Sequence, residues 1–272
     1  MHFLLSNDDG FDAPGLQALV EALAPLGTCW VVAPETERSA TGHALTLHRP
    51  LRARQVRERW WAVDGKPADC VYMGLHHFCP ERPDLVVCGI NRGGNVSLDV
   101  YYSGTVAAAR EAAMAGVRAV ASSLFVFDWD QDPAAHHWDV AQTLTRRLVE
   151  DLLAHPLPPD VLVNLNVPDR PAAEQQGVRL ARLGRRRWHV NVDERRDLRD
   201  RPYYWIGGNH RSFADLPDTD GPLIHAGWAT VTPLVLDATA EAWMDAVSAL
   251  PILTPPGVRN RPDVLRSRCG TP

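Results

Sequence analysis

The stretch that decides the predicted fold lies close to the amino terminus and reads Leu4-Leu5-Ser6-Asn7-Asp8-Asp9-Gly10. The apolar run at 3–5 is typical of a short buried strand, and Asn-Asp-Asp-Gly then favours a turn. The carboxyl end of a buried strand is where open α/β sheets bind their ligands. Two adjacent carboxylates there repel each other unless a cation or a proton offsets their charge. The stretch therefore indicates an α/β fold with a site at Asp8 and Asp9, although these residues alone equally suit an ordinary polar turn.

A strand–helix–strand unit follows from this beginning. Pro14 suits the first residue of a helix and Gly27 its end. Between them apolar residues recur at helical spacing, at Leu16, Leu19, Val20, Leu23 and Leu26. The run 29–33 then predicts a second buried strand. Such a unit makes parallel strands joined by a right-handed crossover.

The alternation of strands and helices continues along the chain. Further buried strands are predicted at 84–90, 118–124 and 161–167, and helices at 68–78, 106–115 and 140–153. We therefore expect an α/β fold, a doubly wound and mostly parallel sheet over residues 1–170. Short antiparallel strands in 44–63 predict a β-hairpin inserted at about 44–64, beside the main sheet. For residues 171–250 we predict a smaller carboxyl-terminal β-rich extension with a helix, including strands at 203–206 and 228–232. Residues 251–272 are predicted to form a loose tail.

The composition disfavours several classes of protein. A chain of 272 residues with 45% hydrophobic and 22% charged residues is ordinary for a globular enzyme. A net charge of −5 argues against a nucleic-acid-binding module. We expect no membrane span and no leader before the first strand. The 5 cysteines form no close CxxC pair, which favours reduced thiols and a cytoplasmic location.

The loop at 34–43 follows the second strand. In a parallel sheet it emerges at the same edge as Asp8 and Asp9. Its hydroxyls and approachable backbone could bind an anion or a cation, and its basic side chains could balance negative charge. The residues concerned are Arg38, Ser39, Thr41, Gly42 and His43. Taken alone, this loop is more simply a solvated connector.

Two later loops add candidate ligands. Residues 91–95 form a polar, glycine-rich loop after the strand at 84–90. Ser103-Gly104-Thr105 opens a helix and offers free backbone N–H groups with two hydroxyls, which suits a phosphate, although plain N-capping is the alternative. We expect Asp69, in the first turn of another helix, to be structural. The basic cluster at 185–188 suits a solvated face or a subunit contact.

The candidate donors share one chemical property, because all of them are hard oxygens. They are Asp8, Asp9, Ser39 and Asn91, with Asn95, Ser103 and Thr105 close behind in the same loops. Such donors select magnesium, manganese or calcium over zinc. A carboxylate-bound cation beside a helix-terminal phosphate site indicates phosphoryl transfer or hydrolysis of a phosphate ester. The chain has neither GxxxxGK[ST] nor GxGxxG, which disfavours triphosphate and dinucleotide chemistry.

Five motifs in order resemble those of the SurE family of stationary-phase survival proteins, metal-dependent nucleoside monophosphate phosphatases. The motifs are Asn7-Asp8-Asp9-Gly10, Ala33-Pro34 leading to the segment 37–43, Pro67-Ala68-Asp69-Cys70, the segment 88–93, and Tyr102-Ser103-Gly104-Thr105. The segments 219–228 and 231–234 also resemble the carboxyl-terminal signature of the family. The sequence departs from the family pattern at Lys66, at Cys88 and in the segment 96–98. None of these positions is a candidate ligand.

The resemblance implies a Rossmann-like amino-terminal domain and a carboxyl-terminal extension exchanged between subunits of a homodimer or homotetramer. By motif position, one divalent cation per subunit is bound by Asp8, Asp9, Ser39 and Asn91. The cation is Mg²⁺ or Mn²⁺, with Ca²⁺ an option in a crystal. The implied catalytic residues are Asp8, Asp9 and Asn95. The implied substrate- and phosphate-binding residues are Gly42, His43, Ser103, Gly104 and Thr105.

The activity implied by this resemblance is hydrolysis of nucleoside 5′-monophosphates by metal-activated water. Its extension to 3′-monophosphates and short polyphosphate is open. A non-catalytic nucleotide or phosphate sensor using the same pocket is the alternative. The sequence leaves open the preferred base, the metal used in the cell, the choice between dimer and tetramer, the effect of Lys66 on specificity, and which aspartate acts as general base.

Overall fold

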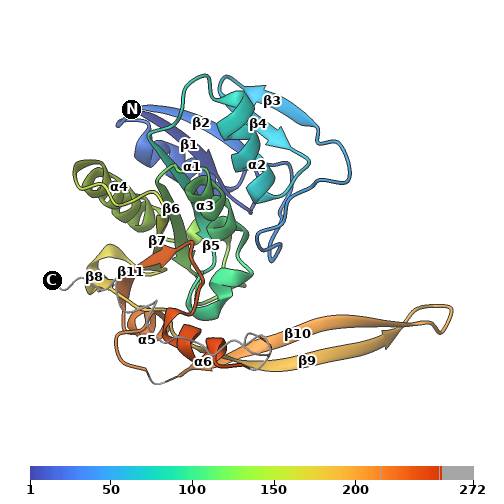
Figure 1. Ribbon diagram of the computed structural model, residues 1–272. Helices are drawn as coiled ribbons and strands as arrows, with labels where there is room; N and C mark the ends of the chain where they lie inside the picture. The colour runs from blue at the N-terminus through green and yellow to red at the C-terminus, as the bar shows by residue number, and fades with distance from the viewer. Residues whose placement is uncertain (215, 251, 253–272) are drawn as a thin grey trace. The chain divides into compact units, whose positions relative to one another are not determined.

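The computed structural model describes residues 1–214, 216–250 and 252 (Figure 1). The chain divides into two units, Met1–Leu236 and Asp237–Pro272. The described strands belong to the first unit. The second contains a 3₁₀ turn, η5 (Glu241–Trp243), followed by the short helix α6 (Met244–Ser248). Apart from Ile252, the tail predicted at 251–272 lies outside the described residues.

Nine strands of the first unit form one mixed sheet, in the order β3-β4-β2-β1-β5-β6-β7-β11-β8. They are β1 (His2–Ser6), β2 (Thr28–Pro34), β3 (Ala53–Arg57), β4 (Trp60–Val63), β5 (Leu85–Arg92), β6 (Ala119–Phe125), β7 (Val161–Pro168), β8 (Gly177–Leu180) and β11 (Trp228–Val235). From β4 to β7 all neighbours are parallel, whereas β3 is antiparallel to β4 and β11 to β7. The predicted α/β fold with a mostly parallel sheet is confirmed.

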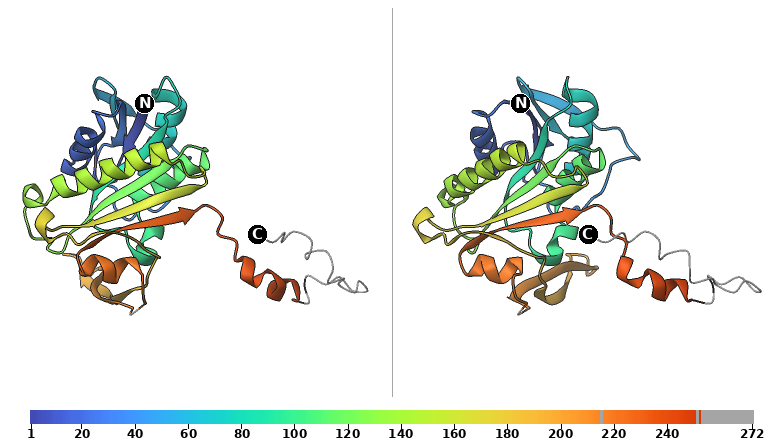
Figure 2. Two further views of the ribbon diagram at one scale, coloured as in Figure 1. Left: turned by 90° about the vertical axis from the view of Figure 1, so that its left-hand side faces the viewer. Right: turned by 60° about the vertical axis from the view of Figure 1, so that its left-hand side comes forward.

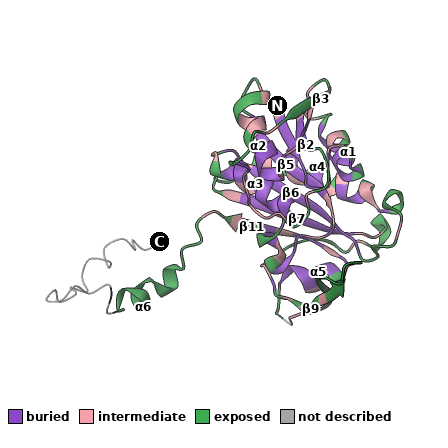
Figure 3. Cartoon of the chain, turned by 90° about the vertical axis from the view of Figure 1, so that its right-hand side faces the viewer, coloured by how far each residue is buried: buried purple, intermediate pink, exposed green. Residues whose placement is uncertain are grey.

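Helices cover both faces of the sheet, as expected of a doubly wound fold (Figures 1 and 2). One face carries α1 (Pro14–Leu23) and α4 (Trp138–Ala154), and the other carries α2 (Pro67–Met73) and α3 (Gly104–Met114). Successive residues of a strand point to opposite faces. Phe3 and Leu5 therefore pack in the core with α1 and α4, whereas Leu4 packs in the core with α2 and α3. Burial is concentrated in the central strands between these layers (Figure 3).

The remaining elements of the first unit are a separate ribbon and several short turns and helices. Two long strands, β9 (Arg186–Arg196) and β10 (Pro202–Phe213), form a separate antiparallel ribbon that extends away from the main sheet (Figure 1). The short elements are the π-helical turn η1 (Gly74–Phe78), the 3₁₀ turns η2 (Ser97–Tyr101), η3 (Pro133–Ala135) and η4 (Ala172–Glu174), and the helix α5 (Asp220–His225). The strand predicted at 203–206 thus belongs to a small sheet of its own.

The sheet differs from the prediction at both edges. Residues 44–47, expected as a strand, are irregular. The hairpin β3–β4 does not stand beside the main sheet, because β4 pairs in parallel with β2 and so extends that sheet. The strand predicted at 228–232 as part of a smaller annex is β11, which pairs with β7. An uncovered β7 would present unpaired backbone groups at a sheet edge, and β11 satisfies them.

Asp69 has the structural role that the sequence predicts. Its carboxylate accepts hydrogen bonds from the backbone N of Lys66 (2.8 Å) and of Thr46 (2.7 Å), and from the Thr46 hydroxyl (2.7 Å). The first bond is half of a capping box at the start of α2. The other two bonds fasten the irregular segment that carries Thr46 to the same helix.

Gly15 marks the closest approach of a helix to the sheet. A Cβ atom built on Gly15 would overlap the backbone O of Ile90 in β5 and would lie 2.8 Å from the Trp138 ring. Only glycine therefore lets α1 pack directly on the carboxyl end of β5. This contact positions the carboxyl end of β5, which carries Asn91.

We predict that Gly15→Ala lowers the free energy of unfolding by about 1–3 kcal/mol, the usual range for overpacking a filled core. Urea unfolding followed by circular dichroism measures the change. Gly207→Ala is the matched control, because a Cβ there would meet its nearest atom, the Asn191 backbone O, only at 3.8 Å. Equal effects of the two substitutions would contradict the close-approach explanation.

Candidate functional site

The loops after several parallel strands meet at the carboxyl edge of the sheet and surround a pocket of about 210 Å³. Five residues that the sequence singled out line it, namely Asp8, Ser39, Asn91, Asn95 and Ser103. Other lining residues, not predicted, include Arg92, Asp99, Tyr102, Trp129 and Arg186. The carboxyl ends of parallel strands share one edge, which explains why segments far apart in sequence meet here.

Asp8 is a buried carboxylate fixed by the start of α3. The Thr105 hydroxyl donates a hydrogen bond to Asp8 Oδ1, and the backbone N of Arg38 donates to the Asp8 backbone O (2.7 Å). A Cβ on Gly104 would lie 2.8 Å from the Asp8 Cβ, so the helix begins directly against this residue. Burial raises the pKa of Asp8, and the bond from Thr105 opposes that rise.

Asp9 is the second carboxylate of the pair. Its Oδ2 accepts a hydrogen bond from the backbone N of Arg92 (2.9 Å), which ties the end of β1 to the end of β5. Burial, together with the neighbouring charge of Asp8, raises the pKa of Asp9 to about 7. Removing two adjacent carboxylates from water is costly unless a positive charge accompanies them. The electrostatics of the pair therefore fit a bound cation.

Ser39 and Asn91 bring neutral oxygens to the same pocket. Ser39 Oγ donates to Glu37 Oε1 at 2.7 Å, and the Asn91 amide nitrogen donates to the Gly93 backbone O at 2.6 Å. This hydrogen bond uses the Asn91 side-chain nitrogen, so the side-chain oxygen remains available as an acceptor. Within the described ranges no group of three or more His, Cys, Asp or Glu could hold a metal. A site here would thus depend on two carboxylates with hydroxyl and amide oxygens, a donor set that suits a hard divalent cation.

The residues predicted to bind phosphate do not all reach the pocket. Ser103 lines it and caps α3, because its Oγ accepts from the backbone N of Val106 at 3.0 Å. Thr105 is buried and its hydroxyl is bonded to Asp8. The backbone N of Gly42 donates to the Tyr102 backbone O (2.9 Å), and His43 Nε2 pairs with Glu111 Oε2 (2.7 Å). The lining of the pocket does not include Gly42, His43, Gly104, Thr105 or Asp9.

Asn95 lies at the junction of the pocket with a buried polar network. Its side-chain Nδ2 donates to Ser123 Oγ (2.9 Å), and its backbone N donates to Asn166 Oδ1 (2.7 Å). Its backbone O accepts from the side chains of Asn164 (2.8 Å) and Asn166 (3.1 Å). These bonds fix the loop after β5 to β6 and β7.

Two arginines at the pocket were missed by sequence reasoning. Arg92 follows Asn91 in a motif that we assigned to the metal, and Arg186 belongs to the basic cluster expected on a solvated face or subunit contact. Arg186 instead forms an ion pair with Asp99 (2.6 Å) and lines the pocket. Nothing in the local sequence links Arg186 to Asp99, because they are 87 residues apart.

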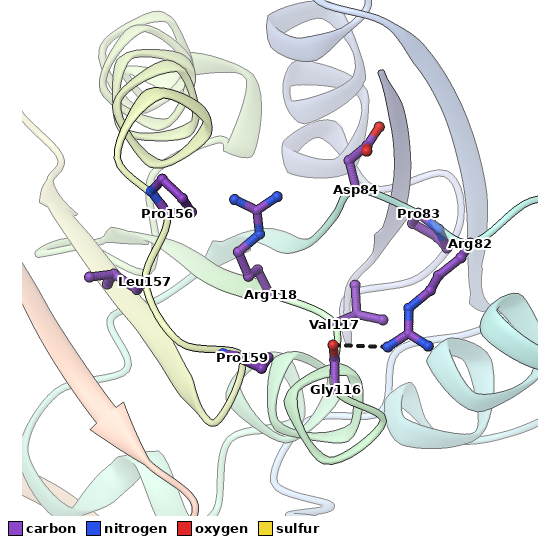
Figure 4. A pocket seen from close by; sticks show the side chains of 9 residues that line it. All are labelled: Arg82, Pro83, Asp84, Gly116, Val117, Arg118, Pro156, Leu157 and Pro159. Atoms are coloured by element: carbon purple, nitrogen blue, oxygen red, sulfur yellow. Dashed lines mark hydrogen bonds between the residues drawn. The ribbon is translucent and has the colours of Figure 1, made fainter.

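A larger hollow, of about 440 Å³, lies at the opposite edge of the sheet (Figure 4). Its residues precede β5 and β6 and follow α4. Arg82 donates to the backbone O atoms of Ala115 and Gly116 (2.9 Å each), and Arg118 to that of Leu152 (3.3 Å). These arginines satisfy carbonyls at the carboxyl ends of helices. None of the predicted site residues lines this hollow.

Fold and site together define a doubly wound α/β protein with an adjacent carboxylate pair and a helix amino terminus at one sheet edge. Within that class the chain belongs to the SurE family, since the model described as "Survival protein SurE" matches residues 3–190. No helix in the described ranges combines the length and apolar character that crossing a bilayer requires.

Named relatives match nearly the whole chain. A protein of Pelobacter propionicus named 5′-nucleotidase SurE is 47% identical over 248 residues, covering 91% of this chain and 98% of the relative. One of Myxococcus xanthus with the same name is 47% identical over 239 residues, covering 87% and 88%. The crystal structure of SurE protein from Aquifex aeolicus superposes with a TM-score of 0.79 at 35% identity, covering 91% of this chain and 98% of that one.

We predict that Thr105→Val lowers the free energy of unfolding by about 1–3 kcal/mol, because a buried carboxyl group loses a hydrogen bond. Urea unfolding measures the change. Thr143→Val is the matched control, since the Thr143 hydroxyl bonds an exposed carbonyl on α4 (2.8 Å). If Thr105 instead acts mainly on phosphate, inhibition by inorganic phosphate will weaken while the unfolding free energy stays unchanged.

Proposed function

We propose that this chain is a 5′-nucleotidase that hydrolyses nucleoside 5′-monophosphates to nucleoside and inorganic phosphate with the help of one divalent cation. The names of relatives that match about nine-tenths of the chain support this activity. The observation that carries it is the adjacent pair of the buried Asp8 and the half-buried Asp9, with both pKa values raised, near the hydroxyl of Ser103 at a helix amino terminus. Activity on 3′-monophosphates and short polyphosphate is an extension of the same proposal.

The cation ligands in this proposal are Asp8, Asp9, Ser39 and Asn91. The fit rests on donor chemistry, because every donor is a hard oxygen of the kind that Mg²⁺ or Mn²⁺ accepts. When bound, such a cation polarises a phosphate and lowers the pKa of water. The protein's own contribution is to hold the carboxylates in place, through Thr105 on Asp8 and the backbone N of Arg92 on Asp9.

Phosphate recognition is assigned to the start of α3. The Ser103 oxygen accepts from Val106, so its hydroxyl hydrogen can be donated to a phosphate oxygen. Positive charge from Arg92 at the same pocket favours an anionic ligand, whereas the charge of Arg186 is offset by Asp99. Asn95 is the proposed further catalytic residue, with its amide held by Ser123. Gly42, His43 and Gly104 act in this proposal by supporting the loops around the phosphate.

The test of this activity is release of inorganic phosphate from AMP by the full chain with added Mn²⁺, and its loss on chelation. Restored release after Mn²⁺ is returned would exclude irreversible damage by the chelator. Calorimetry with AMP separates the enzyme from a sensor. Binding without turnover under Mg²⁺, Mn²⁺ and Ca²⁺ alike would favour the sensor and overturn the proposed activity.

We predict that Asp8→Asn and Asp9→Asn each lower kcat/KM for AMP by at least about a hundredfold and weaken Mn²⁺ binding in parallel. Each change removes one of two negative charges at the proposed cation site. Calorimetric titration with Mn²⁺ and steady-state kinetics measure both effects. Asp151→Asn, an exposed position on α4, is the control. Unchanged Mn²⁺ affinity in both variants would rule out the proposed site.

We predict that water attacks phosphorus directly and that no phosphoryl-aspartate forms. Each carboxylate has one oxygen already bonded, to Thr105 in Asp8 and to Arg92 in Asp9, and both carboxylates are proposed cation ligands. A single turnover in heavy-oxygen water places the label in phosphate. Label recovered in a peptide containing Asp8 or Asp9 would instead demonstrate a covalent intermediate.

The proposed assembly is a homodimer or homotetramer in which the carboxyl-terminal extension is exchanged. Its support is the ribbon β9–β10, which exposes large apolar side chains on an isolated two-stranded sheet. These are Val192, Tyr203, Tyr204, Trp205 and Ile206. A two-stranded ribbon with so much exposed apolar surface is marginal by itself in water, so contact with a second copy would stabilise it.

We predict that Ile206→Lys lowers the assembly mass measured by light scattering, because it places a charge at a side chain that is 91% exposed in the single chain. Leu47→Lys is the control, since Leu47 is 86% exposed but lies in an irregular segment outside the ribbon. A monomeric parent chain, or equal effects of the two changes, would count against the ribbon as the interface.

A further inference from the structure

An exposed tryptophan stands beside the carboxylate pocket. Trp129 belongs to the loop between β6 and α4, and it lines the pocket together with Asp8, Asn91 and Ser103. It is 58% exposed. The indole lies against Gly93, because a Cβ built on that glycine would come within 2.8 Å of the ring. A large aromatic surface is thus open to solvent at the site proposed to bind a nucleotide.

The position of Trp129 is fixed by Arg92. The guanidinium lies 5.2 Å from the centroid of the indole, and Nη2 donates to the backbone O atoms of Trp129 (3.0 Å) and Gln131 (3.3 Å). The backbone N of the same arginine donates to Asp9 Oδ2 (2.9 Å). One residue therefore fixes the indole relative to the carboxylate pair.

Arg92 is itself held by a buried histidine. Arg92 Nε donates to His136 Nε2 (3.2 Å). Because Nε2 accepts this bond, the neutral His136 ring carries its proton on Nδ1. The protonated Nδ1 donates a hydrogen bond to Asp169 Oδ2 at 2.6 Å. The other oxygen of Asp169 accepts from the backbone N of His137 (2.8 Å). The series of contacts from Asp169 through His136 and Arg92 to Trp129 holds an exposed side chain in a preorganised position. A surface tryptophan without a ligand does not need such support.

We infer that Trp129 is the stacking platform for the base of the nucleotide. This inference rests on the proposed 5′-nucleotidase function and names the part of the substrate that the loop recognises. Arg92 covers one side of the indole, and the exposed surface offers a flat apolar face to a flat ligand. Aromatic rings bind bases through their π-faces, which every base possesses. Trp129 therefore contributes affinity for a base and does not read its hydrogen-bonding edges.

Comparison of a substrate with a base and one without tests this role. We compare AMP with ribose 5-phosphate for the parent chain, Trp129→Ala, Trp129→Phe and the control Trp243→Ala, a change at a tryptophan that is 67% exposed. Loss of one base–aromatic stack corresponds to roughly 5- to 140-fold weaker binding. We expect Trp129→Ala to raise KM for AMP by such a factor and to leave kcat/KM for ribose 5-phosphate unchanged within about twofold. Trp129→Phe retains most of the AMP affinity.

A second measurement does not depend on turnover. Adenosine carries the base but no phosphate, so its Kd from calorimetry should rise in Trp129→Ala by a factor similar to that of KM for AMP. The stacking role is overturned if AMP and ribose 5-phosphate lose activity equally, or if KM for AMP and Kd for adenosine do not change. If the parent chain hydrolyses neither substrate, the proposed function fails, and adenosine binding still decides the role of Trp129.

Discussion

Two adjacent carboxylates, Asp8 buried and Asp9 half-buried, are the constraint on which the rest of the site depends. Asp8 and Asp9 lie at the end of β1, where burial raises the pKa of both and the charge of Asp8 raises that of Asp9 further. The surrounding residues offset part of this cost through the Thr105 hydroxyl, which bonds Asp8, and the backbone N of Arg92, which bonds Asp9. The remainder is what a divalent cation would offset.

The order of the strands brings the residues of this site together. β1 lies between β2 and β5, so the loops after these strands flank Asp8 and Asp9. α3 begins directly against Asp8 because Gly104 has no side chain to keep it away. The same helix start presents Ser103 to the pocket. The cation site and the anion site proposed for the chain are therefore consequences of one parallel topology.

The far half of the chain is fastened near the pocket by another buried carboxylate. Asp220, at the start of α5, accepts hydrogen bonds from the backbone N atoms of Ser97 (2.6 Å) and Gly184 (3.0 Å). These bonds join α5, the segment before β9 and the turn η2. Arg186, two residues after Gly184, is thereby brought to Asp99 and to the pocket lining. The extension is thus part of the site as well as the base of the exposed ribbon.

The sequence by itself determined the sheet, its parallel centre and the positions of Asp8, Ser39, Asn91 and Ser103 at one edge. Periodicity is a local property, and parallel strands carry their carboxyl-terminal loops to a common edge. Only the tertiary structure decided the partner of each side chain. The residues around Thr105 in the sequence suggest a phosphate site, yet the Thr105 hydroxyl donates its hydrogen bond to Asp8, 97 residues away.

The edges of the sheet and the second layer of the site were likewise decided in three dimensions. The antiparallel strand β11 joins β7 because an open edge needs a partner, which no local pattern specifies. Arg92 at the end of β5 is joined to His136 and Asp169 by hydrogen bonds between segments that are far apart in the sequence. Such contacts depend on side-chain directions that follow from packing, whereas the strand and helix periods are already present in the order of the residues.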